Sequence, residues 1–388
     1  MNTMRWIVAA AHGWVALRLL PDVLHAAGWP AALALALLIA ASAALVPQAL
    51  RRPRGPRSPA EQRRDDRLAW ASLGLMGLFS SLFVLTLVRD VARLAAGLAG
   101  LALHRTLDEG WVVDSAVAVP LAALVITAVG LWNARRPARV KSVDVPLRDL
   151  PAALQGFRIV QISDLHVGAT IKGDYLQRIV EAVNRLEADV VAITGDLVDG
   201  SVHDLAPHVA SLGQLRSRHG TFVVTGNHEY YSGALPWIDE LRRLGLTVLI
   251  NEHVVLQHGS PAQASSPLVL AGVADFSAHH FEPTHRSDPR RAVAGAPADA
   301  VKVLLAHQPR SAPAAADAGF HLQLSGHTHG GQFLPWNFFV RLQQPFTAGL
   351  HALRDLWVYT SRGTGYWGPP KRFGAPSEIT HLRLVAAD

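Results

Sequence analysis

The residues most able to do chemistry occur in short polar clusters, each at the end of an apolar run. The clusters are Asp164-Leu165-His166, Gly195-Asp196, Gly226-Asn227-His228-Glu229, His307 and Gly326-His327-Thr328-His329-Gly330-Gly331. Carboxylate, amide and imidazole groups suit manganese, iron, zinc or cobalt, so the clusters could bind divalent ions without identifying the metal. The chain has no cysteine. Thiolate ligands, disulfides and cysteine nucleophiles are therefore excluded.

Taken singly, most of these clusters could be ordinary turns, because Asp-x-His and Gly-Asp arise by chance in many chains. The ordered set is more specific, since each member follows a strand-like run. The runs are FRIVQIS, DVVAIT, TFVVT, VKVLLA and HLQLS. Continuous apolar runs of this length are typical of strands that are buried on both faces. The carboxyl ends of such strands meet at one rim of a sheet, so we expect the clusters to form one site.

The local spacing also suits a pair of metal ions. Two ions roughly 3.5–4 Å apart need a shared anionic ligand, which a carboxylate in a tight glycine turn can provide. An Asp-x-His triplet in an extended segment places both side chains on one side, because side chains alternate along a strand. Gly195, Gly226 and Gly326 permit backbone conformations closed to other residues and a close approach of the chain to the ions.

The ordered series resembles the calcineurin-like metallophosphoesterase superfamily. Gly-His-Thr-His-Gly-Gly-Gln and the later Gly363-Thr364-Gly365-Tyr366 resemble its YkuE/YaeI-like branch, and the similarity extends from about residue 155 to 384. The resemblance implies a four-layer αββα sandwich, in which two sheets pack face to face with helices outside. That α/β domain would follow an all-α transmembrane region.

The resemblance also implies roles for the clustered residues, with two divalent ions as cofactors. Asp164, His166 and His329 would bind the first ion, Asn227, His307 and His327 the second, and Asp196 both. A hydroxide formed from a metal-bridging water would attack phosphorus in line with the leaving oxygen. His228 would donate a proton to that oxygen or stabilise its charge.

Other polar residues leave alternatives open. Tyr366 and Arg372, in a glycine-rich segment with aromatic and cationic residues, could contact substrate or simply pack. Asp199 could orient a ligand imidazole or be a plain turn carboxylate. Asp275 could shape the pocket, although nothing in the local sequence requires it.

The chain before about Arg135 has a different character. Half of all residues are hydrophobic and only 17% are charged, and Ala, Leu and Val dominate this part. The stretches 31–50, 68–88 and 111–132 are each long enough to cross a ~30 Å hydrocarbon core. A fourth, about 5–27, is interrupted by His12, Arg18 and Asp22, so it could be a span or an interfacial helix. The alternative for the strong stretches is buried helices of a soluble protein.

The domain organisation follows from this contrast. We expect residues 1–134 to be a membrane anchor with three or four transmembrane helices, 135–154 a linker, and 155–388 the metallophosphoesterase domain.

Arginine and lysine bias predicts the orientation in the cytoplasmic membrane. Positive residues gather between Arg51 and Arg67 and again after the last span, and such clusters lie on the cytoplasmic side. The catalytic domain would then be cytoplasmic, and the loop with Arg89, Arg93 and Arg105 balanced by Asp90, Asp108 and Glu109 would be outside. The first cluster is Arg51, Arg52, Arg54, Arg57, Arg63, Arg64 and Arg67, and the second is Arg135, Arg136, Arg139 and Lys141.

The expected function is hydrolysis of a phosphoester or pyrophosphate. The bilayer is one partner, and the anchor makes a lipid-linked substrate plausible because it confines the enzyme where amphiphiles gather. One alternative is a membrane sensor or scaffold with the same fold. Such a protein would be expected to lack at least one metal-ligand residue, and none is missing from this sequence. The other is a nuclease, but the net charge of +6 owes much to the anchor arginines and no basic, aromatic-lined path is evident. No protein partner is inferred.

Overall fold

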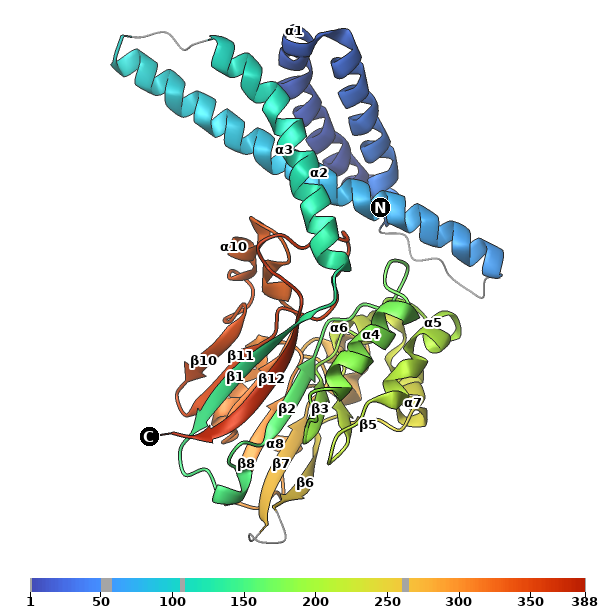
Figure 1. Ribbon diagram of the computed structural model, residues 1–388, viewed down its shortest axis with the longest axis vertical. Coiled ribbons are helices and arrows are strands. Elements are labelled where there is room, and N and C mark those ends of the chain that lie inside the picture. Colours follow the sequence, from blue (N-terminus) through green and yellow to red (C-terminus); the bar gives the residue numbers. More distant parts are fainter. Residues whose placement is uncertain (1, 50–57, 105–108, 260–264, 388) are drawn as a thin grey trace. The chain divides into compact units, whose positions relative to one another are not determined.

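The computed structural model describes residues 2–49, 58–104, 109–259 and 265–387 (Figure 1). Two compact units divide the chain. The helical unit comprises Met1–Asn133 and Gly368–Lys371, and the catalytic unit comprises Ala134–Trp367 and Arg372–Asp388. Several residues used above to predict the orientation lie outside the described parts. They are Arg51, Arg52, Arg54, Arg57, Arg105 and Asp108.

Three helices of the helical unit are long and apolar enough to cross a membrane: α1 (Asn2–Ala49), α2 (Pro59–Ala102) and α3 (Glu109–Arg135). Helix α1 is interrupted at Gly28, whose φ of 78° is not helical. His12 Nε2 lies 2.9 Å from Ser42 Oγ, thirty residues later, whereas a straight helix would separate them by about 45 Å. The two halves of α1 therefore fold back on each other (Figure 1), and the two apolar stretches predicted here form one hairpin.

The charges that interrupt the first apolar stretch have partners on α2. Arg18 Nε donates to Asp90 Oδ2 at 2.7 Å. Asp22 accepts from Arg89 and, at 3.2 Å, from Arg93. Arg89, Asp90 and Arg93 were expected in a loop, but α2 continues through them because their charges are neutralised by the α1 hairpin.

The short segment Gly368–Lys371 belongs to the helical unit, although it lies far along the chain. Lys371 Nζ donates to Gly77 O at 3.1 Å, to Thr127 Oγ1 at 3.4 Å and to Ser81 Oγ. Gly130 leaves room for this side chain, since a Cβ there would lie 2.6 Å from Lys371 Cγ. Small residues on α2 and α3 thus accommodate the lysine.

The catalytic unit contains two six-stranded sheets, in the orders β1-β12-β2-β3-β4-β5 and β10-β11-β9-β8-β7-β6. The five predicted strands are β2, β3, β4, β8 and β9. The first sheet comprises β1 (Arg139–Leu147), β12 (Glu378–Ala386), β2 (Arg158–Ile162), β3 (Val190–Ile193), β4 (Thr221–Val223) and β5 (Thr247–Val248). The second comprises β10 (Gly349–Leu353), β11 (Leu356–Thr360), β9 (Leu322–Ser325), β8 (Val301–Leu305), β7 (Ser266–Gly272) and β6 (Glu252–His258).

The apolar runs form strands buried on both faces. In β3, Val190 and Ala192 pack with residues of the second sheet, whereas Val191 and Ile193 pack against helices. This alternation follows from the two-residue period of a strand. The helices outside the first sheet are α4 (Gly173–Asn184), α5 (Val202–Val209) and α7 (Ala234–Arg243), and those outside the second are α8 (Pro289–Ala292) and α9 (Ala312–Asp317). The layers are helix, sheet, sheet and helix, which confirms the predicted sandwich.

Within the stretch 135–154, which was expected to be a linker, residues 139–147 form strand β1 of the first sheet. Strand β1 pairs in parallel with β12 along its whole length, from Arg139 opposite Glu378 to Leu147 opposite Ala386. Val145 and Leu147 are buried in the core between the sheets. The basic residues that begin this strand were interpreted as a membrane-topology signal, which hid its alternating apolar pattern.

Candidate metal centre

Each predicted cluster follows the carboxyl end of its strand, and the clusters meet at one rim. Their ligand atoms form three overlapping groups in which all atoms lie within 4.8 Å of one another. The groups are Asp164 with His166 and His329, His166 with Asp196 and His228, and Asp196 with His307 and His327. The overlap brings together loops that follow strands of both sheets.

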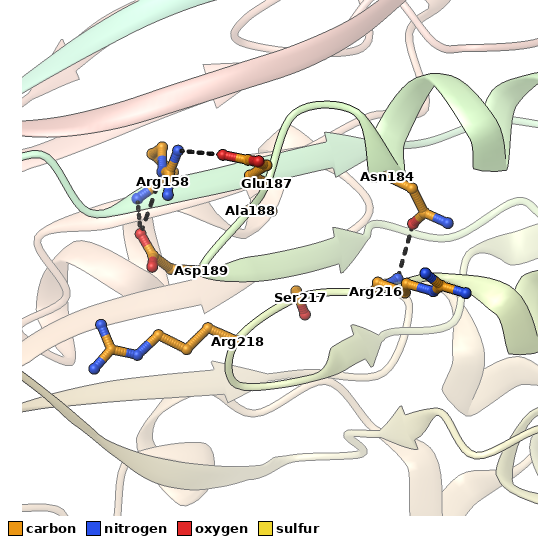
Figure 2. A pocket seen from close by; sticks show the side chains of 8 residues that line it. All are labelled: Arg158, Asn184, Glu187, Ala188, Asp189, Arg216, Ser217 and Arg218. Carbon is orange, nitrogen blue, oxygen red and sulfur yellow. Dashed lines mark hydrogen bonds and ion pairs between the residues drawn. The ribbon is translucent and has the colours of Figure 1, made fainter.

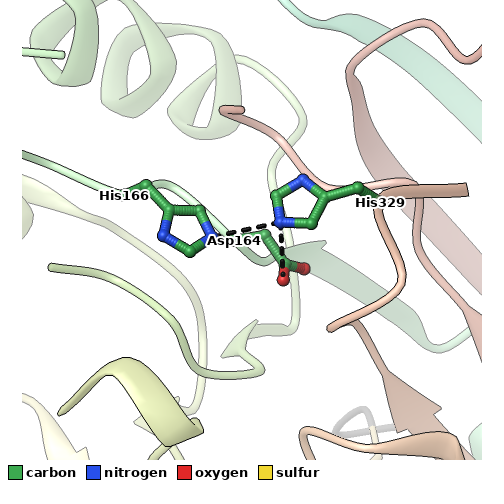
Figure 3. Close-up of side chains that lie close together, drawn as sticks. All are labelled: Asp164, His166 and His329. Atoms are coloured by element: carbon green, nitrogen blue, oxygen red, sulfur yellow. Dashed lines mark hydrogen bonds and ion pairs between the residues drawn. The ribbon is translucent and has the colours of Figure 1, made fainter. Parts of the chain in front are cut away.

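The first group is built from Asp164, His166 and His329 (Figure 3). His329 Nε2 lies 3.1 Å from His166 Nε2 and 3.4 Å from Asp164 Oδ1. All three side chains are buried. Asp164 is fixed by the backbone, because the N–H of His327 donates to its carboxylate at 2.9 Å.

A second group lies around Asp196. His307 Nε2 lies 3.1 Å from Asp196 Oδ2 and 3.2 Å from His327 Nδ1. The same carboxylate oxygen is 3.9 Å from His166 Nε2, so Asp196 lies between the two groups. Asn227 Oδ1 is buried and has no hydrogen-bond partner in the described part of the chain. An orphaned buried oxygen is costly unless a ligand such as a cation satisfies it.

The histidine tautomers follow from their outer hydrogen bonds. His307 Nδ1 lies 2.7 Å from Thr194 O, and a carbonyl oxygen only accepts, so Nδ1 carries the hydrogen. By the same argument, His166 Nδ1 donates to Asp199 Oδ2 at 3.2 Å. In their neutral forms, both Nε2 atoms therefore present lone pairs to the space beside Asp196. Either a proton or a cation must lie between lone pairs and carboxylate oxygens this close, and this set of nitrogen and oxygen donors is one that divalent metal ions accept.

Burial and mutual charge perturb the ligand pKa values. Burial raises the pKa of Asp164. Burial alone would also raise the pKa of Asp196, but the positive charges of His307 and neighbouring histidines lower it well below its usual value. The pKa of His327 falls to about 3, because the imidazole is buried and lies beside His307. Asp196 is therefore ionised and His327 neutral at neutral pH, as metal ligands require.

His228 has a different electrostatic environment. Its Nδ1 is hydrogen-bonded to Asp199 Oδ1, and its Nε2 lies 4.0 Å from Asp196 Oδ2. Burial lowers the pKa of His228, but Asp196 and Asp199 outweigh this and raise it to about 9. The two carboxylates beside His228 thus favour the protonated form of its imidazole, the form from which a proton can be donated.

The backbone at the site is strained. Non-glycine residues rarely adopt positive φ, and such strain concentrates at functional sites. The left-handed residues here are Asp164 (54°), His166 (51°), Asp196 (54°), His327 (69°) and His329 (51°). The Asp-x-His triplet was expected to be extended. Its side chains instead converge through a left-handed loop beyond β2.

Two carboxylates beyond the assigned ligands support the site. Glu229 accepts from the backbone N–H groups of Asp196 at 2.9 Å, Leu197 at 2.7 Å and Gly226 at 2.6 Å, which ties the loops after β3 and β4 together. No role was predicted for Glu229 from the sequence, although it directly follows Gly-Asn-His. Asp199, for which two readings were left open, accepts from both His166 and His228.

Tyr366 and Arg372 lie behind the metal centre, and each is only 1% exposed. The Tyr366 hydroxyl donates to Thr170 O at 3.2 Å. Arg372 donates to Arg362 O at 2.7 Å and to His329 O at 3.1 Å. Trp367, by contrast, is half exposed, and its ring centre is 5.8 Å from that of His228. These positions favour packing for Tyr366 and Arg372, and solvent-side contact for Trp367.

A separate hollow of about 420 Å³ lies at the opposite rim of the first sheet (Figure 2). It is lined by Arg158, the first residue of β2, and by residues that precede β3 and β4, whereas the candidate metal ligands follow these strands. Arg158 lies 3.9 Å from Glu187 and 3.8 Å from Asp189, so its charge is already balanced. The lining residues are Arg158, Asn184, Glu187, Ala188, Asp189, Arg216, Ser217 and Arg218. The hollow is therefore not the metal centre.

Comparison with known proteins agrees with this geometry. The calcineurin-like phosphoesterase family profile matches residues 157–331. A "transmembrane protein with metallophosphoesterase domain" of Bos taurus is 43% identical over 269 residues, 68% of this chain and 61% of that protein. A metallophosphoesterase of Campylobacter jejuni is 32% identical over 332 residues, 83% of this chain and 84% of that protein. YkuE of Bacillus subtilis, also a metallophosphoesterase, is 28% identical over 287 residues, 69% of this chain and 94% of that protein.

The chain belongs to the calcineurin-like metallophosphoesterase family. Its apolar helices and its similarity to the transmembrane relative indicate association with a membrane. The chain covers about three-fifths of the length of the Bos taurus protein.

Proposed function

We propose that the protein is a membrane-anchored hydrolase with a dinuclear metal centre, and that it cleaves phosphoester or pyrophosphate bonds. The observation that carries this proposal is the overlap of the ligand groups at Asp196. Asp164, His166 and His329 would hold one ion, Asn227, His307 and His327 would hold the other, and Asp196 would be shared between them.

The bound ions supply Lewis acidity and a hydroxide nucleophile at neutral pH. The chain's own residues provide the remaining functions. Asp199 orients His166 and His228 through their Nδ1 hydrogens. His228, protonated at neutral pH, donates to the leaving oxygen. Glu229 holds the loop that carries Asp196 in place. The carboxylate of Asp196 is therefore not displaced when charge develops at phosphorus.

A lipid-linked phosphoester is the substrate class that the surroundings of His228 favour. Trp367 and Tyr231 are both exposed, and both rings pack edge-on against the His228 ring. Apolar surface beside a phosphate-cleaving site suits the hydrocarbon part of an amphiphile, and the anchor brings the enzyme to a bilayer.

Positive residues favour a cytoplasmic catalytic unit. Arg63, Arg64 and Arg67 lie near the start of α2, and Arg135, Arg136, Arg139 and Lys141 lie at and beyond the end of α3. Two helices separate these groups, so one side of the membrane can hold both. A single cysteine in place of Asp355, an exposed residue of the catalytic unit, can be labelled with an impermeant maleimide. Labelling should require permeabilised cells, and labelling of intact cells would contradict this orientation.

The metal centre is tested with the full chain purified in detergent. We expect two metal ions per chain and hydrolysis of aryl phosphate monoesters or diesters after loading with manganese, zinc, iron or cobalt. Asp196→Asn should lose metal and activity, whereas Asp239→Asn, which changes an exposed aspartate of α7, should retain both. A folded protein that binds one ion or none, or that binds two and cleaves no phosphoester, would contradict the proposal.

A further inference from the structure

An exposed apolar segment begins five residues after the last histidine of the Gly-His-Thr-His motif. We call residues 334–342 the apolar segment; it contains the short helix α10 (Trp336–Val340). Five of its large apolar side chains are between 41% and 81% exposed, and they are Leu334, Trp336, Phe338, Phe339 and Leu342. Large exposed apolar groups gathered in one short segment indicate an interaction surface.

The charge around this segment is one-sided. The sequence contains no acidic residue between Asp317 and Asp355, and Arg341 lies within the apolar segment. Aromatic and aliphatic side chains accompanied by arginine are typical of segments that enter the interfacial layer of a bilayer. Anionic lipids attract such a cation, whereas a nearby carboxylate would be repelled.

The apolar segment and the residues just before it are hydrogen-bonded to the residues that flank Gly368–Lys371. Gln332 Nε2 donates to Trp367 O, and Trp367 N donates to Gln332 Oε1, both at 2.8 Å. Leu334 N donates to Phe373 O at 3.1 Å. Trp367 and Phe373 flank Gly368–Lys371, which belong to the helical unit. The start of the apolar segment and nearby Gln332 are therefore hydrogen-bonded to the two residues that flank this four-residue stretch.

We propose that residues 334–342 insert into the interfacial layer of the bilayer that holds the helices, with anionic phospholipid as the partner. His329, a ligand of the metal centre, precedes this segment by five residues. The inserted segment thus keeps the metal centre beside the lipid headgroups. Binding of lipid by these residues does not depend on the proposed hydrolysis, so the two can be tested separately.

The absence of cysteine makes a direct test available. Phe338→Cys and Leu342→Cys, each labelled with an environment-sensitive fluorophore, are compared in the full chain, with one chain per lipid nanodisc of phosphatidylcholine and phosphatidylglycerol. Leu235→Cys on α7 is the matched control, because this leucine is also exposed. Quenching by spin-labelled lipid and by aqueous iodide is measured for each label.

We expect the labels at 338 and 342 to shift their emission to shorter wavelength, to be quenched by the spin-labelled lipid and to lose most iodide quenching. The label at 235 should show the reverse. Iodide quenching at 338 and 342 equal to that at 235 would overturn the proposal. Protection from iodide without quenching by lipid would also overturn it, because protein would then cover the segment.

A second variant tests the role of the positive charge of Arg341. Arg341→Glu should move the label at 342 toward its aqueous emission in anionic nanodiscs, and less in nanodiscs of phosphatidylcholine alone. An unchanged label in both would contradict the role given to anionic lipid. Thermal unfolding followed by circular dichroism confirms that each labelled variant is folded, independently of metal and activity.

Discussion

Asp199 connects two histidines with different tasks. Its carboxylate accepts from Nδ1 of His166, a proposed metal ligand, and from Nδ1 of His228, the proposed proton donor. Burial raises the pKa of Asp199, but its contacts with the two imidazoles outweigh this effect and lower the pKa below its usual value. The carboxylate is thus ionised at every pH at which the enzyme would work, and both imidazoles remain oriented.

Asp199→Asn should weaken metal binding and activity by about 10–100-fold, because an amide presents only one accepting oxygen and cannot serve both imidazoles. Metal content after dialysis and turnover at saturating metal measure the two effects. Asp239→Asn is the control, since Asp239 is an exposed aspartate of α7. Retention of full metal content and rate by Asp199→Asn would show that the two histidines are positioned without it.

The raised pKa of His228 predicts a pH dependence. A group that must be protonated to act is active below its pKa and loses activity as pH rises through it. For His228 this decline should occur at or below about 9, since bound cations oppose protonation. A rate that stays constant from pH 7 to pH 10 in the unsubstituted enzyme would rule out this role.

His228→Gln should remove this alkaline decline and lower kcat by about 10²–10⁴-fold, while two metal ions remain bound. His203→Gln, at an exposed histidine of α5, should leave the pH profile intact. A His228→Gln enzyme with an unchanged alkaline decline would assign that titration to another group.

At the level of residues, the sequence predicts which side chains come together but not how the backbone presents them. Asp164, His166, Asp196, His307 and His329 were expected to meet because each follows an apolar run. Their left-handed backbone was not expected, because a positive φ in a non-glycine residue is maintained by contacts distant in sequence. The bonds from Glu229 to the Asp196 loop likewise depend on the packing of β3 beside β4.

Among the elements, the strands that carry ligands were the easiest to predict. Their apolar runs are buried on both faces and end in polar residues. Strand β1 is different, because it lies at the edge of its sheet and only one face is buried. Many of its residues are therefore polar. Its basic residues are as typical of a segment that follows a membrane helix as they are of an edge strand.

Opposite faces of β1 provide a test of its place in the sheet. Val145→Asp puts a carboxylate into the core between the sheets and should destabilise the catalytic unit by on the order of 3 kcal/mol. Val140→Asp, at an exposed position of the same strand, should change stability little. Thermal unfolding of the full chain measures both. Equal effects would mean that residues 139–147 do not pack as a buried strand.

In the molecule as a whole, the lengths of the apolar stretches predict the helices. The contacts between α1 and α2, however, depend on charged residues that are far apart in the sequence. Arg18 and Asp22 weakened the case for a first span, and Arg89, Asp90 and Arg93 suggested a loop. In the structure these residues neutralise one another across α1 and α2. A hydropathy profile considers each segment separately, so it does not detect ion pairs between segments.

Arg89 is the most buried cation of this network, and it also donates to Ser115 Oγ at 2.8 Å. Arg89→Met should destabilise the helical unit by about 3–5 kcal/mol, since it removes one partner of a buried ion pair. The double variant Asp22→Asn with Arg89→Met should recover part of this loss. Thermal aggregation in detergent, with Arg64→Met at an exposed position as the control, measures these effects. A double variant no more stable than Arg89→Met alone would contradict the pairing.

The pairing of α1 with α2 bears on how the protein is made. Translation delivers the α1 hairpin to the membrane before α2 exists, so Arg18 and Asp22 enter the insertion machinery without the groups that later neutralise them. Isolated charges at membrane depth are costly, and a nascent chain that stops before α2 has no means to offset them. The ion pairs that neutralise Arg18 and Asp22 can therefore form only after the ribosome has supplied Arg89 and Asp90.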